Sequence, residues 1–128
     1  MPATAFSRGV RMSPRKVSVV ASLVRGRSVS DALTILEHTP RRPAEILRKS
    51  LLSAKANAEH NHNYKPDSLY ISEISVTAGP RFRRYRPAAR GRALRFERKT
   101  SHIKVVVDGK KREIKQKTAD KTTAKGSK

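Results

Sequence analysis

The chain contains few acidic residues. Its 128 residues include 10 Asp and Glu against 30 Lys and Arg, which gives a formal charge of +20. So large an excess of one sign destabilises a compact state through self-repulsion, unless a polyanionic partner neutralises it. Nucleic acid is the partner that this imbalance favours. An anionic membrane surface, or a basic protein that is merely solvated, are the alternatives.

Cysteine and long apolar runs are also absent. The absence of cysteine excludes a disulfide framework and a thiolate zinc site, and it fits a reducing compartment. No apolar run approaches the ~18 residues needed to span a bilayer. The chain starts without the charged and then apolar pattern of a signal peptide, so we expect no export. Hydrophobic residues make up 36% and aromatics 5% of the chain, which predicts one domain with a small core.

Catalytic motifs are missing as well. The acids are spread singly along the chain, so none forms the carboxylate pair of a metal-dependent nuclease. There is neither a P-loop nor a dinucleotide fingerprint. His60 and His62 are too few for a metal site, and we interpret them as polar residues at a helix end. No nucleophile and base accompany His102. We therefore expect no catalytic residue, no metal, no cofactor and no enzymatic activity.

Three helices are predicted in the first half of the chain. The first begins at Pro14 and ends before Gly26, the second has Ser30 as its N-cap, and the third opens at Pro43 and ends at residues 61–63. Apolar residues recur through them at helical spacing: Val17, Val20, Ala21, Val24, Leu33, Leu36, Leu47, Leu51, Ala54 and Ala58.

The pattern elsewhere is that of strands. Residues 3–11 are expected to form a short strand. Period-two alternation begins after residue 68, and its change of phase between Ile71 and Ile74 indicates a bulge. A turn near residues 87–88 would place Ile74 opposite Ile103, so that the last two strands form one antiparallel hairpin.

This hairpin is too long for the body to cover. About 17 residues per strand give a ribbon of roughly 55 Å. Between residues 77 and 102, Leu94 is the only aliphatic side chain larger than alanine. A bare two-stranded ribbon is marginal in water, so we expect its base to pack on the helices and its tip to be ordered by a partner. Residues 109–128 are Lys-rich and are expected to be disordered until bound.

The distal hairpin combines arginine with aromatic residues. No acid occurs between Glu73 and Glu97, and Phe82, Tyr85 and Phe96 are interleaved with seven arginines. These arginines are Arg81, Arg83, Arg84, Arg86, Arg90, Arg92 and Arg95. Arginine binds phosphate through a bidentate fork and stacks on bases, and aromatic rings offer every base a stacking surface. The pattern favours RNA with exposed bases over a lipid surface.

Several segments together resemble one family. They are Met12-Ser13-Pro14-Arg15-Lys16, Ser53-Ala54-Lys55-Ala56-Asn57-Ala58, Gly79-Pro80, Arg90-Gly91-Arg92-Ala93 and Thr100-Ser101-His102-Ile103. Over residues 5–108 the chain resembles the bacterial large-subunit ribosomal protein twenty-two family. The resemblance implies an α+β fold, with three helices packed on a three-stranded antiparallel sheet and a long protruding β-hairpin. We therefore expect a single domain at residues 1–108 that includes a hairpin arm at about 77–101, and the Lys-rich tail at 109–128 lies outside the resemblance.

The resemblance also implies a function. Such proteins are structural and assembly components of the cytoplasmic large ribosomal subunit, with no enzymatic activity. The implied partners are several domains of 23S rRNA, neighbouring large-subunit proteins, and the nascent polypeptide, which meets the hairpin tip in the exit tunnel. No membrane partner and no cofactor are implied.

Site residues follow by position. The expected RNA contacts are Arg11, Arg15, Lys16 and Lys55 in the body, and Arg81, Arg83, Arg84, Arg86, Arg90, Arg92, Arg95, Arg98, Lys99 and His102 in the hairpin. The expected tunnel-wall tip is Arg86, Pro87, Ala88, Ala89, Arg90 and Gly91. The family usually has a basic residue after the tip proline, where this chain has Ala88, and we expect Arg86 or Arg90 to replace that charge.

Two other functions remain open at this point. Architectural DNA-binding proteins also carry basic β-ribbon arms with an apolar wedge, a role that Pro87 would fill. The chain lacks an obvious dimer-forming helical core, which counts against this reading. An anionic-membrane binder is a weaker alternative, because there is no large amphipathic helix with bulky apolar residues. The basic pairs Arg25/Arg27 and Arg41/Arg42 are either partner contacts or solvated surface.

Overall fold

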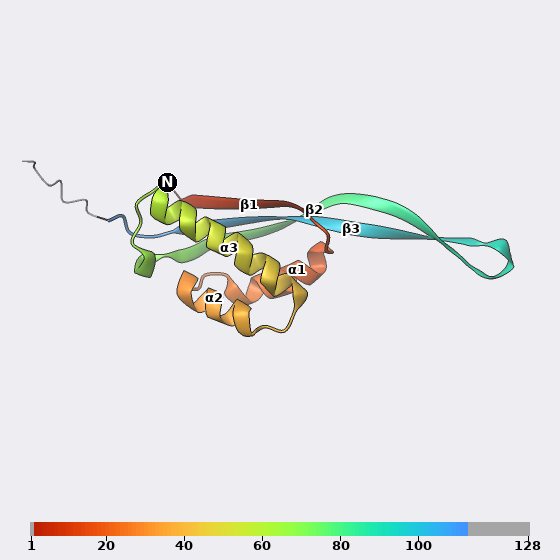
Figure 1. Ribbon diagram of the computed structural model, residues 1–128, viewed down its shortest axis with the longest axis horizontal. Coiled ribbons are helices and arrows are strands. Elements are labelled where there is room, and N and C mark those ends of the chain that lie inside the picture. Colours follow the sequence, from red (N-terminus) through yellow and green to blue (C-terminus); the bar gives the residue numbers. More distant parts are fainter. Residues whose placement is uncertain (1, 113–128) are drawn as a thin grey trace, which may run out of the picture.

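A computed structural model describes residues 2–112 of the chain. Its elements are β1 (Ala3–Val10), α1 (Pro14–Val24), α2 (Val29–His38), α3 (Arg42–His60), the 3-10 turn η1 (Pro66–Ser68), β2 (Tyr70–Pro87), the 3-10 turn η2 (Ala89–Gly91) and β3 (Ala93–Asp108). The helices gather around one end of the sheet, while the β2–β3 ribbon extends far beyond them (Figure 1). The expected α+β architecture of three helices and a long hairpin is confirmed.

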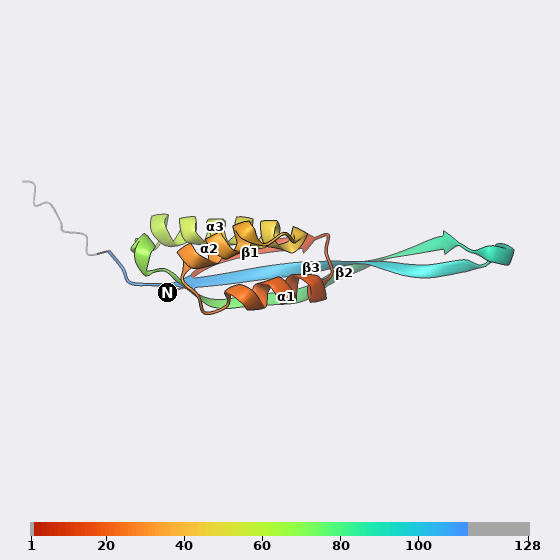
Figure 2. The same ribbon diagram turned by 90° about the horizontal axis from the view of Figure 1, so that it is seen from below.

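The sheet has the strand order β1-β3-β2, and both pairings are antiparallel. All three helices cover one face of it, with α3 lying along β1 and α1 along β2 (Figures 1 and 2). The core forms between these layers. Ile71, Ile103 and Val105 are fully buried, and Leu47 and Leu51 of α3 are 1% exposed. The apolar side chains that alternate along the strands, and those that recur at helical spacing along the helices, therefore point into this core, as expected.

The small residues of α3 bring it close to β1. Ala54 and Ala58 are fully buried. Their small side chains let the helix approach the strand, and Asn57 Nδ2 donates a hydrogen bond to the carbonyl oxygen of Thr4 at 2.9 Å. This bond satisfies a carbonyl at the outer edge of the sheet, where β1 has no strand neighbour.

The second helix begins two residues before its expected start. Ser28, not Ser30, is the N-cap, and its Oγ accepts a hydrogen bond from the backbone N–H of Asp31 at 3.1 Å. The reason is tertiary: Val29 N–H donates to the carbonyl oxygen of Leu69 at 3.0 Å, and the Val29 side chain is buried. This contact with the segment before β2 fixes where the helix can begin.

The hairpin register also differs from the expected one. Ile74 pairs with Val105, and Ile103 pairs with Val76. The loop at residues 88–92 centres the hairpin on Arg90, and the bulge between Ala78 and Arg81 then moves the pairing back by one residue. A shift of two residues leaves Ile74 and Ile103 facing the core, because side chains alternate with period two. The bulge expected between Ile71 and Ile74 is confirmed.

The body extends beyond residue 108. Lys65 N–H donates to the carbonyl oxygen of Lys110 at 2.9 Å, and Arg112 N–H donates to that of Asn63 at 2.7 Å. Residues 110–112 therefore pair with the loop after α3, and the expected boundary between domain and tail at residues 108–109 stays a prediction. The rest of the expected tail, residues 113–128, lies outside the described part.

Candidate nucleic-acid interface

The arm is the part of β2 and β3 that projects beyond the helices, residues 81–99. Its side chains are exposed, apart from Ala88 and Phe96, which are half-buried. The arm therefore has no core, as expected from its composition. Its order in the isolated chain rests on cross-strand hydrogen bonds and side-chain pairs.

The register divides the arm into two faces. The Phe face contains the cross-strand pairs Phe82–Arg98, Arg84–Phe96 and Arg86–Leu94. The Tyr face contains Arg81–Lys99, Arg83–Glu97 and Tyr85–Arg95. Both phenylalanines thus lie on one face, and each face keeps an excess of positive charge. A flat ribbon with two such faces can contact a polyanion on both sides.

Aromatic rings organise the arginines of the arm. The Arg86 guanidinium carbon lies 4.7 Å from the ring centroid of Phe96, and that of Arg95 lies 5.8 Å from Tyr85. Stacking of this kind contributes about 0.5–1 kcal/mol at exposed sites. It restrains the planar guanidinium while leaving its N–H edge available for phosphate. Some of the aromatics expected to stack on bases therefore support arginines.

The acid of the arm neutralises little of its charge. Glu97 Oε2 lies 3.5 Å from Nη1 of Arg81, and both side chains are exposed. Exposed ion pairs of this kind contribute at most about 1 kcal/mol and weaken with salt. Arg81 remains able to exchange this carboxylate for a phosphate.

A groove of about 1090 Å³ lies where the arm leaves the body. Its arm side is formed mainly by the Phe face, and its body side comes from the end of β1 and from the starts of α1 and α3. The arm residues in its lining include Phe82, Arg84, Arg86, Phe96, Arg98 and Lys99, and the body residues include Arg11, Met12, Lys16, Arg42 and Pro43. We call this the crook groove.

The fold brings two of the four expected body contacts into this groove. Arg11 and Lys16 meet the arm arginines there, whereas Arg15 and Lys55 are not part of its lining. Lys55 Nζ lies 3.8 Å from Glu59 Oε1, so part of its charge is balanced within α3. The sequence left open whether Arg42 contacts a partner. Its place beside Pro43 at the start of the third helix is the one signal that could have identified it as a groove residue.

His102 has a structural partner. Its Nδ1 accepts a hydrogen bond from the backbone N–H of Gly9 at 3.0 Å. Gly9 has a φ of +68° and lies where the β1 register shifts between Ser7 and Val10. The imidazole thus satisfies a backbone donor that the bulge removes from the ladder. An RNA contact through its other ring nitrogen stays a prediction.

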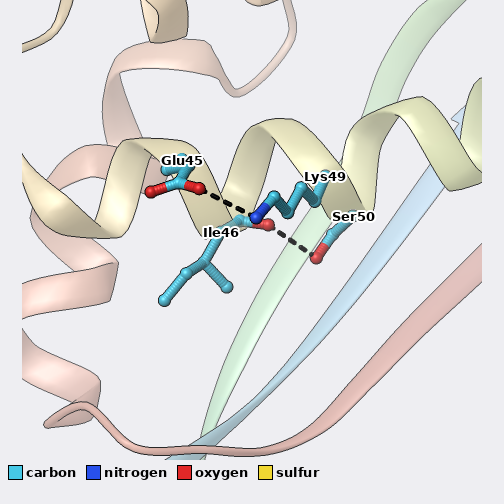
Figure 3. A network of polar contacts seen from close by, with 4 residues as sticks. All are labelled: Glu45, Ile46, Lys49 and Ser50. Carbon is cyan, nitrogen blue, oxygen red and sulfur yellow. Dashed lines mark hydrogen bonds and ion pairs between the residues drawn. The ribbon is translucent and has the colours of Figure 1, made fainter.

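The outer side of α3 is electrically balanced. Lys49 Nζ lies 2.8 Å from Glu45 Oε1 (Figure 3). The hydrogen bond and positive charge of Lys49 lower the pKa of Glu45. On the same helix, Ser50 Oγ donates to the Ile46 carbonyl oxygen at 3.0 Å and lies 2.8 Å from Ser7 Oγ in β1. On this side of α3 the ion pair therefore leaves little positive charge from Lys49 for a polyanion.

The tip lies slightly further along the chain than expected. Arg86 and Pro87 belong to β2 and pair with Leu94 and Ala93. The loop itself spans residues 88–92 and is closed by Ala88 N–H donating to the Arg92 carbonyl oxygen at 2.7 Å. Arg90 and Gly91 adopt positive φ values of 58° and 69° within it. A non-glycine residue seldom takes this conformation, so the turn at the end of the arm imposes an unusual backbone geometry on Arg90.

Within residues 2–112, no group of three or more His, Cys, Asp and Glu side chains is placed to hold a metal ion. No helix in that range combines the length and apolar character needed to cross a membrane.

Known proteins are similar to this chain in sequence. The family model described as ribosomal protein L22p/L17e matches residues 5–108. The large ribosomal subunit protein uL22 of Clostridium tetani is 50% identical over 107 residues, which cover 84% of this chain and 96% of that protein. The uL22 of Oceanobacillus iheyensis is 50% identical over 111 residues, covering 87% and 98%. The chain belongs to the ribosomal protein L22p/L17e family.

Proposed function

We propose that this protein is a structural, non-enzymatic component of the cytoplasmic large ribosomal subunit, where it binds 23S rRNA and supports subunit assembly beside neighbouring ribosomal proteins. The observation that carries the proposal is the coreless arm, which bears arginines on both faces. A ribbon without a core gains its order from a partner, and the charge and planarity of its side chains match RNA.

The arm would bridge separate RNA segments by neutralising the charge of their phosphates. RNA segments repel one another through their phosphates, and a thin ribbon enters gaps that a globular domain cannot. Arginines of the Phe face, such as Arg84 and Arg98, would contact one segment. Arg83 and Arg95 of the Tyr face would contact another. By holding both, the arm would stabilise the packing of separate RNA domains around it.

The tip is proposed to form part of the polypeptide exit tunnel wall and to meet the nascent polypeptide. At this end the charge missing at Ala88 is supplied by Arg90, because Arg90 lies in the terminal loop, whereas the Arg86 guanidinium lies against Phe96 further down the arm. The test is to replace Ala88 by Arg and map RNA protection. If Arg90 already covers the site, Ala88→Arg adds no protected nucleotide, and a new protected position at the tip would contradict this.

The experiment that tests RNA binding is a salt series with large-subunit rRNA. Each phosphate contact that is lost should lower the slope of log K against log salt by about 1. We expect this for Arg83→Gln and for Arg92→Gln. Lys49→Gln is the matched control, since it removes one exposed charge that is already paired with Glu45. Salt-independent binding, or arm variants that behave like the control, would refute the proposal.

Competition separates this function from architectural DNA binding. Duplex DNA should displace the protein from structured large-subunit RNA only at large excess. Equal competition by duplex DNA would favour the β-ribbon DNA-binding alternative.

A further inference from the structure

The crook groove combines one open aromatic ring with a cationic wall. Phe82 lies in the arm wall of the groove and is 48% exposed. Arg11, Lys16 and Arg42 belong to the opposite wall, although Arg42 comes from a different helix than Lys16. The fold thus assembles, from three separate segments, an apolar surface that faces several positive charges.

Phe82 differs from the other phenylalanine of the same face. The Arg86 guanidinium covers Phe96 at 4.7 Å, and Phe96 is half-buried. The nearest guanidinium to Phe82, that of Arg84, lies 6.0 Å from its ring centroid, at the limit of a cation–π contact. Phe96 therefore serves to position an arginine, whereas much of the Phe82 ring is open to the groove.

The cationic wall favours a phosphate. The first turn of α1 contains no acidic residue, and the side chain of its N-cap Ser13 makes no capping hydrogen bond. Ser13 and Lys16 both line the groove, so no acid of this turn offsets the positive end of the helix dipole or the charge of Lys16 and the nearby arginines. Glu97 is the one acid among the lining residues and lies 3.5 Å from Arg81.

We propose that the crook groove holds an unpaired RNA nucleotide, with its base stacked on Phe82 and its phosphate against Arg11, Lys16 and Arg42. This inference rests on the proposed function, since it takes RNA as the partner. A base inside a helix has both faces covered by its neighbours, so only an unstacked nucleotide can offer a face to the ring. The groove volume of about 1090 Å³ accommodates a nucleotide together with part of its backbone.

The test compares two aromatic residues on opposite faces of the arm. Phe82→Leu keeps apolar bulk but removes the stacking ring, and Tyr85→Leu makes the matched change on the Tyr face. Full-length variants are bound to large-subunit rRNA, and base reactivity is mapped by chemical probing. We expect Phe82→Leu to weaken binding about tenfold and to lose protection of one nucleotide that is unpaired in the free RNA. The Tyr85→Leu variant should retain protection of that nucleotide. The Phe82→Tyr variant keeps an aromatic ring at position 82 and should retain it as well.

A photoreactive benzophenone side chain at position 82 identifies the occupant. A cross-link to the same unpaired nucleotide would support the proposal. A cross-link to a base-paired nucleotide, or to another ribosomal protein in assembled subunits, would overturn it. So would equal probing patterns for Phe82→Leu and Tyr85→Leu. These results are distinct from failure of the proposed function, in which the unmodified protein would not bind the RNA at all.

Discussion

Gly79 lies where the arm leaves the body, and its replacement by alanine should be destabilising for a steric reason. It falls within the register shift between Ala78 and Arg81. A Cβ at Gly79 would lie 2.5 Å from Thr100 Oγ1 and 3.3 Å from His102 Nε2. Thr100 cannot turn away freely, since it is 4% exposed and its Oγ1 donates to the Pro80 carbonyl oxygen at 2.7 Å.

Three effects set the size of the change in the free energy of unfolding. Alanine reduces the entropy of the unfolded chain, which alone would stabilise the protein by about 0.4–1 kcal/mol. Overpacking of a filled site costs about 1–3 kcal/mol. Loss of the Thr100–Pro80 hydrogen bond costs about 0.5–1.5 kcal/mol more. We therefore expect Gly79→Ala to lower the free energy of unfolding by about 0.5–4 kcal/mol.

Urea unfolding followed by circular dichroism measures this change, which should lower the midpoint without altering the m-value. The double variant Gly79→Ala/Thr100→Ala should be no less stable than Thr100→Ala alone, because the clashing oxygen is gone. Gly79→Ala in a Thr100→Ser background is the control: serine keeps the hydroxyl that clashes with the new Cβ, so the cost should remain. The reasoning would be refuted if Gly79→Ala were neutral or stabilising, or if its cost persisted in full without the Thr100 hydroxyl.

Two further predictions concern stability. Ser28→Ala should lower the free energy of unfolding by about 1 kcal/mol because it removes the N-cap of α2, whereas Ser30→Ala should cost less; equal losses in urea unfolding would contradict the observed cap. Burial, reinforced by the neighbouring Asp108, raises the pKa of Tyr64, so the folded state favours its neutral form. The resulting stabilisation is complete below the unfolded tyrosine pKa of about 10 and is lost as the pH rises through the folded value. The stability of the wild type relative to Tyr64→Phe should therefore fall as the pH rises above about 10, and a constant difference would contradict the raised pKa.

Much of the fold follows from local patterns. Pro14 and Gly26 mark the first helix, where Gly26 has the positive φ of 71° that a residue after a helix end adopts. The phase change between Ile71 and Ile74 indicates the observed bulge. These features were predictable because helix ends and strand alternation depend on residues a few positions apart.

The candidate site was predictable only in part. The arginines and aromatics of the arm are evident from their spacing, and so is the absence of a core between residues 77 and 102. The distinct roles of Phe82 and Phe96 are not evident, because they depend on which arginine reaches which ring. The role of Arg42 was left open and the crook groove was missed, because the residues that form the groove are far apart in the chain.

The sequence by itself determined that this protein is a basic α+β domain with a coreless, arginine-rich hairpin, since charge, composition and periodicity are local properties of the chain. The tertiary structure alone decided that Ser28 caps α2, that the hairpin turns about Arg90, and that Arg11, Lys16 and Arg42 face Phe82 across one groove. Each of these depends on packing between distant segments. Burial of Val29 beside Leu69 sets the helix start, bulges and loop length set the register, and the departure of the arm from the body creates the groove.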